Sequence, residues 1–66
     1  MNHIEVLNYI QTESEFAGVS NYPIEVEEIA VHFKMPIVDV IVLLEQLIAY
    51  KAIRYCDKGG LSVCLE

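Results

Sequence analysis

The chain has 66 residues, which is enough for one small domain spanning residues 1–66 and leaves no room for a second. Hydrophobic residues make up 55% of it, a share that excludes the disordered class. Ten Asp and Glu residues against four Lys and Arg residues give a formal net charge of −6, which argues against indiscriminate binding to nucleic-acid phosphates.

The N-terminus has no basic segment ahead of an apolar stretch, so it does not read as a signal peptide. The longest apolar run, residues 40–44, is bounded by Asp39 and Glu45 and is far shorter than the ~20 residues of a membrane span. We therefore expect a cytoplasmic protein with no membrane partner and with reduced cysteines.

Apolar spacing predicts two helices in the first half of the chain. Ile4, Leu7 and Ile10 recur every third residue and predict a helix over about 3–13. Residues 16–23 are rich in turn-forming residues, and Ile24 after Pro23 suits a short extended piece. A second helix is expected over about 26–34, with acidic residues in its first turn as the helix dipole favours.

The second half predicts one helix and a hairpin. A third helix is expected over about 36–50, opened by Pro36. Two strand-like runs then fall within residues 53–65, and the segment 57–60, which contains Gly59-Gly60, separates them as a turn. The expected fold class is α+β, mostly helical, with three helices and a C-terminal two-stranded hairpin.

Residues 24–65 also carry a characteristic series of features: an acid-acid-apolar-Ala run, an apolar residue three positions later, a short turn, a repeat of apolar residues, and an apolar strand opener. In this chain these are Glu27-Glu28-Ile29-Ala30, Phe33, Lys34-Met35-Pro36, Val40 with Leu44 and Leu47, and Ile53. The series resembles the winged-helix branch of helix-turn-helix domains. In that family Lys51 would occupy a position where glycine is usual, and the hairpin would be the wing. The resemblance implies a fold whose members bind either DNA or protein.

The third helix lacks the side chains with which a DNA reader recognises bases. Residues 37–50 contain no Arg, Lys, Ser, Thr or Asn, and Gln46 is their only neutral polar residue. At 100° per residue, the inner face of this helix is predicted to carry Ile37, Val40, Leu44 and Leu47. The side turned away from that core carries five residues that we predict to bind a partner: Val38, Ile41, Val42, Glu45 and Ala49. We expect protein–protein recognition by this face, with a second copy or another protein, as a small regulator or inhibitor of transcription or replication machinery, for example one encoded by a phage. A helix that is apolar all round can instead be central and fully packed.

A DNA-binding regulator working as a homodimer is the alternative, with DNA contacts from the four basic residues Lys34, Lys51, Arg54 and Lys58. Against ten acids, a solubilising role around the hairpin is favoured over DNA contact for Lys51, Arg54 and Lys58. A third possibility is that the acidic N-terminal half mimics DNA to a basic partner.

The two cysteines are not expected to pair. With Lys58-Gly59 as a two-residue turn, Cys56 would face Leu61 and Cys64 would face Ile53. Since adjacent facing pairs alternate sides of a ribbon, the two thiols would then point to opposite faces, which rules out a disulfide.

No catalytic or cofactor motif is found. The chain has no Ser-His-Asp arrangement, phosphate-binding glycine loop or metal-ligand spacing, and His3 and His32 stand apart from the cysteines. We therefore expect no enzymatic activity, no cofactor, no metal and no small-molecule substrate.

Overall fold

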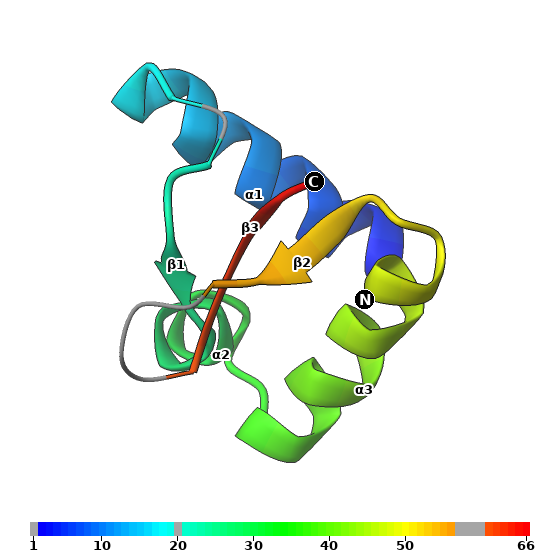
Figure 1. Cartoon of the computed structure of the whole chain (residues 1–66). Coiled ribbons are helices and arrows are strands. Elements are labelled where there is room, and N and C mark those ends of the chain that lie inside the picture. The colour runs from blue at the N-terminus through cyan, green and yellow to red at the C-terminus, as the bar shows by residue number, and fades with distance from the viewer. Residues whose placement is uncertain (1, 20, 57–60) are drawn as a thin grey trace.

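The computed structural model describes residues 2–19, 21–56 and 61–66 as three helices and one antiparallel sheet (Figure 1). In chain order the elements are α1 (His3–Ala17), β1 (Ile24–Glu25), α2 (Val26–Phe33), α3 (Ile37–Ala49), β2 (Ile53–Tyr55) and β3 (Ser62–Leu65). The expected α+β class is confirmed, and the arrangement is compatible with a winged-helix shape. No helix within the described residues is long and apolar enough to cross a membrane.

The sheet has three strands in the order β1-β3-β2, so the expected two-stranded sheet is wrong. Figure 1 shows β3, in red, lying between β1 and β2 and leading towards α1. The extended piece expected at Ile24 is the third strand: Ile24 pairs with Val63 and Glu25 with Ser62. The extended piece is therefore predicted, but two residues are too few to show an alternating pattern, and its pairing with β3 is not predicted.

The first helix runs four residues beyond its predicted end at residue 13 and stops at Ala17. Its end is set by Gly18, which adopts the left-handed conformation with φ +80°. The Gly18 N–H bonds to the Glu15 carbonyl, and the Val19 N–H to the Ser14 carbonyl, in a Schellman motif. The apolar pattern fades before this point, which is why periodicity alone stops short of the cap.

The buried face of α1 also differs from the predicted one. Val6, Ile10 and Ser14 are buried, whereas Ile4 is exposed and Leu7 is half-buried. The spacing of four between the buried residues is as typical of a helix as the predicted spacing of three. The sequence therefore predicts the helix but not which of two neighbouring apolar stripes faces the core.

The second and third helices lie within one residue of their predicted ends. Lys34 caps α2, and Pro36 and Tyr50 flank α3 without belonging to it. Lys34 and Lys51 both have left-handed backbones, with φ +56° and +62°. The expectation that Lys51 occupies a glycine position is thus consistent with the backbone found there.

One core joins the helices to one face of the sheet. α1 and α2 both pack on α3, and β3 contacts α1. The buried apolar side chains are Val6, Ile10, Ile24, Val26, Ile29, Ala30, Val40, Leu44, Leu47, Ile53 and Val63. The predicted inner residues Val40, Leu44 and Leu47 of α3 are therefore confirmed, whereas Ile37, also predicted on that face, is 39% exposed.

The hairpin register corrects the prediction for the cysteines. Arg54 pairs with Cys64, and the Cys56 N–H donates to the Ser62 carbonyl at 2.9 Å. Cys56 and Cys64 therefore lie on the same face of the sheet, not on opposite faces. The predicted pairing is off by one residue, and a slip of one reverses the face of every side chain. The predicted turn residues Lys58-Gly59 lie outside the described residues.

Candidate functional site

The outward side of α3 is apolar and exposed. Val38 is 68% exposed and Val42 is 56% exposed, one helical turn apart. Glu45 and Ala49 continue the same line and are exposed, and we call these four residues the α3 strip. The fifth predicted member, Ile41, is half-buried and packs against the core. The alternative of a helix sealed on all sides is therefore wrong for the two valines.

This orientation follows from the packing of the opposite side. Val40, Leu44 and Leu47 are spaced by four and three residues and face the core. That requirement leaves residues 38 and 42 on the far side of the helix, where the fold asks for no apolar group. Their exposure is a property of these particular residues rather than a consequence of the architecture.

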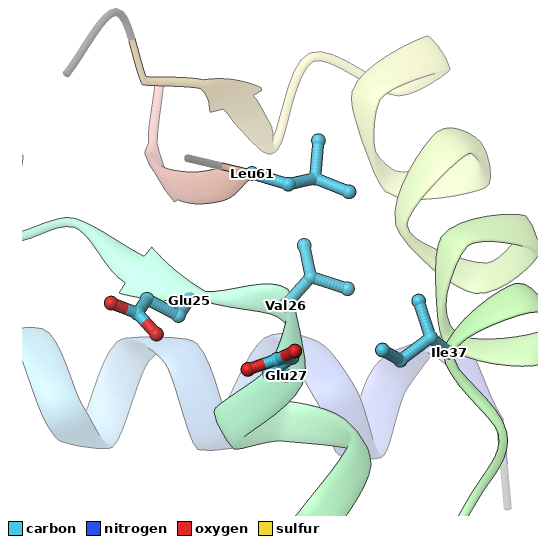
Figure 2. Close-up of a pocket in the computed structure, with 5 residues that line it drawn as sticks. All are labelled: Glu25, Val26, Glu27, Ile37 and Leu61. Atoms are coloured by element: carbon cyan, nitrogen blue, oxygen red, sulfur yellow. The ribbon is translucent and has the colours of Figure 1, made fainter. Parts of the chain in front are cut away.

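A pocket of about 320 Å³ adjoins the start of α3. Figure 2 shows the side chains of Val26, Ile37 and Leu61 around it, with the carboxylates of Glu25 and Glu27 on the side of β1 and α2. The Val26 N–H donates to the Leu61 carbonyl at 3.0 Å, which holds the chain before β3 against the start of α2. We call this site the Ile37 pocket.

Sequence reasoning missed this pocket for two reasons. It depends on the pairing of β1 with β3, which brings residues 26 and 61 together. It also depends on Ile37 lying half-exposed at the first position of α3, whereas the periodicity placed Ile37 on the inner face. The sequence signal that bears on the position of Ile37 is Pro36, whose extended backbone directly precedes the first residue of α3.

Apolar surface continues from this pocket onto the second helix. A neighbouring shallow depression is also lined by Ile37, together with Val31 and Met35. Val31 is exposed on α2. Ile37 lines both hollows, and Val38 of the α3 strip follows it in the first turn of α3. We therefore treat these surfaces as one candidate contact region with acidic side chains beside it.

Three of the four basic residues predicted for DNA contact lie within the described part of the chain. Lys34 precedes α3 and Lys51 follows it, so they are separated by the length of a helix of 13 residues, about 20 Å. Arg54 is exposed on β2, and Lys58 lies outside the described residues. Each of these two lysines is also the left-handed residue that ends a helix.

An aromatic cluster connects α1 to α2 beside the candidate contact region. The Tyr9 hydroxyl donates to Glu28 Oε2 at 2.8 Å, and the Tyr9 and His32 rings stack with centroids 4.2 Å apart. Phe33 meets the edge of Tyr9 at 5.6 Å. Burial, followed by the hydrogen bond to Glu28, raises the pKa of the Tyr9 phenol. These contacts hold two helices together, and Tyr9, Glu28 and His32 also line a shallow depression beside them.

Metal-binding side chains do not converge in the described part of the chain. There, no group of three or more His, Cys, Asp or Glu side chains is placed to hold a metal ion. The Ile37 pocket carries carboxylates and apolar side chains only. Apolar side chains and negative charges therefore lie side by side there.

Comparison of the chain with models of protein families, with curated proteins and with solved structures finds no match.

Proposed function

We propose that this chain is a winged-helix module that recognises another protein through the α3 strip and the Ile37 pocket. The winged-helix assignment is supported by the order of elements and by the left-handed backbone at Lys51. The observation that carries the function is the exposure of Val38 and Val42 on a helix without a basic side chain. Apolar patches of this kind mark contact surfaces.

The partner class that suits this region is a cationic protein surface with an apolar anchor. The chain carries a net charge of −6, so a second copy would be repelled while a basic partner would be attracted. Lys and Arg side chains combine an apolar stem with a charged head. The Ile37 pocket offers the complement, with Ile37 and Leu61 for the stem and the Glu27 carboxylate for the head.

Proteins that handle nucleic acid present cationic surfaces of this sort. This supports a role as a regulator or inhibitor of transcription or replication machinery, in which the acidic module occupies a basic surface. On binding, Val38 and Val42 would each contribute roughly 1.5 kcal/mol if fully covered. Contact with DNA itself is disfavoured, because Asp39 and Glu45 on α3 would face phosphates.

The test uses a defined probe. A Lys/Leu amphipathic helical peptide is titrated into the isotopically labelled protein, and an otherwise identical Glu/Leu peptide serves as the charge control. We expect amide shifts at residues 37, 38 and 42, saturating at micromolar to submillimolar peptide, and at least tenfold weaker binding of the Glu/Leu peptide.

Two matched variants distinguish binding at this surface from non-specific binding to any exposed apolar side chain. Val42→Gln removes an exposed apolar side chain from the α3 strip without changing the charge, and Phe16→Gln does the same on α1, remote from the strip. We expect Val42→Gln to weaken peptide binding about tenfold and Phe16→Gln to leave it unchanged. Equal effects of the two variants, or shifts confined to another face, would rule out the proposal.

The alternative of a DNA-binding homodimer is tested alongside. Light scattering measures whether the chain dimerises, and a mobility shift with duplex DNA at low salt measures whether it binds. A dimer that shifts DNA, with binding lost in Arg54→Ala and falling steeply with salt, would replace the protein-recognition proposal.

A further inference from the structure

The outer face of the sheet, the face turned away from Ile53 and Val63, carries a compact group of sulfur and oxygen side chains. The strand register places Cys64 opposite Arg54. The hydrogen bond from the Cys56 N–H to the Ser62 carbonyl places Cys56 opposite Ser62 in the same way. Because side chains alternate along a strand, Cys56, Ser62 and Cys64 all project from this outer face. Cys64 is 1% exposed, and Cys56 is half-buried.

Ser62 supplies an observation independent of the cysteines. Its side chain is 4% exposed, and among the described residues its Oγ has no hydrogen-bond partner. A buried hydroxyl left without a partner costs roughly 1–3 kcal/mol. Its neighbours on this face are the two cysteines, so an electron-poor ligand bound between the sulfurs would also give the Ser62 lone pairs a partner.

We propose that Cys56 and Cys64, with Ser62 Oγ beside them, form a binding site for one thiophilic metal ion of the Cu(I) class. The cysteines are diagonal neighbours across the hairpin, an arrangement with Cα atoms about 7–8 Å apart. That exceeds the ~4.4–6.8 Å that a disulfide spans, so a direct S–S bond needs backbone movement. A bridging ion with metal–sulfur bonds of about 2.3 Å holds two sulfurs about 4 Å apart and suits the longer span.

The donor atoms select the ion. Thiolates favour soft cations, and two thiolates with one weak oxygen donor suit Cu(I) better than ions that require four strong ligands. Each thiol releases its proton to solvent as its sulfur binds the ion. The resulting complex carries one negative charge, and the Arg54 guanidinium opposite Cys64 is the nearest compensating cation on β2. Glu25, opposite Ser62, is the nearest opposing charge on β1.

The test is an anaerobic titration of the fully reduced 66-residue chain with Cu(I), buffered by the chromophoric chelator bathocuproine disulfonate. Ultraviolet thiolate-to-copper absorption reports binding, and native mass spectrometry reports stoichiometry. We expect one Cu(I) per chain. Cys56→Ser and Cys64→Ala should each weaken binding by at least 100-fold, and Ser62→Ala by about tenfold. Ser14→Ala, which removes the other buried hydroxyl without a partner in the described residues, is the matched control and should leave affinity unchanged.

Circular dichroism of each variant confirms that it is folded before its affinity is compared, and Cys56→Ser, at the less buried cysteine, carries the decision if Cys64→Ala unfolds. Copper binding equal to wild type in Cys56→Ser would overturn the proposal. So would one ion shared between two chains, or a product two mass units lighter that binds no copper, since the latter is an intrachain disulfide.

Discussion

α1 and α3 pack against each other and each buries one face, but their outward sides differ in where apolar residues lie. Each helix buries residues spaced three or four apart. The exposed side of α1 carries Asn8, Gln11 and Glu15 along its length, with exposed apolar side chains near its two ends, Ile4 and Phe16. The exposed side of α3 carries Val38 and Val42 instead. Since the architecture demands only the inner faces, the apolar outer side of α3 is surplus to folding and points to a contact made outside the monomer.

The largest expected effect comes from truncating a buried side chain on the inner face of either helix. Leu44→Ala in α3 and Ile10→Ala in α1 each truncate a fully buried side chain, and each should lower the free energy of unfolding by about 2–5 kcal/mol. Urea unfolding followed by circular dichroism measures both. In a domain this small, such a loss is a large share of the total stability.

The matched control for that pair lies on the outer side of α3. Val38→Ala should change the free energy of unfolding by no more than about 0.5 kcal/mol, because the side chain is 68% exposed. A loss as large as that of Leu44→Ala would contradict the comparison, since it would mean that the outer side is covered in solution.

The next effect concerns the one polar residue on the inner face of α1. Ser14 is buried, and among the described residues its Oγ has no hydrogen-bond partner, whereas the inner face of α3 is wholly apolar. Ser14→Ala removes that hydroxyl and improves helix propensity, so it should raise the free energy of unfolding by about 1–2 kcal/mol. Thr12→Ala, on the exposed side, is the control for propensity alone. Equal gains in the two variants would show that Ser14 Oγ is satisfied in solution.

A smaller effect links α1 to α2 and depends on pH. The raised pKa of Tyr9 means that folding favours the protonated phenol, so its contribution is fully present below the ordinary phenol pKa of about 10. It is then lost as the pH rises towards the folded-state value. Tyr9→Phe removes the hydrogen bond to Glu28 and should cost about 0.5–1 kcal/mol at pH 7.

The measurement is the difference in unfolding free energy between wild type and Tyr9→Phe, followed from pH 7 to pH 11. The difference should be constant up to about pH 9 and shrink above it. Taking the difference cancels the titration of Cys64, whose pKa burial raises to about 11, with a further contribution from the neighbouring Cys56 thiol. A difference that stays constant up to pH 11 would contradict this account.

Local patterns in the sequence predict much of the fold. The second and third helices are predicted to within a residue at each end, because their apolar spacing and Pro36 are local signals. The exposure of Val38 and Val42 is predicted for the same reason, since the buried face of α3 is set by its own periodicity.

Features that depend on pairing between distant segments are not predicted. Strand β1 exists because Ile24 pairs with Val63, and the Ile37 pocket exists because that pairing brings Leu61 to the start of α2. The relation of the two cysteines turns on a register that a one-residue change in the turn reverses. In each case the sequence shows the segments but not their alignment.

The smallest effect concerns the ends of the two helices. α1 ends in Gly18 and α3 in Lys51, both left-handed and both in Schellman motifs, yet only glycine adopts this conformation without a steric cost of about 1–2 kcal/mol. Lys51→Gly should therefore raise the free energy of unfolding by about 0.5–1 kcal/mol, after the entropy that glycine adds to the unfolded chain is subtracted. Gly18→Ala should lower it by a similar amount, and Lys51→Ala, which keeps the strain, should give no gain. If Lys51→Gly also left peptide binding by the α3 strip unchanged, the strain at Lys51 would be unrelated to recognition. The functional difference between the two helices would then lie only on their outward sides.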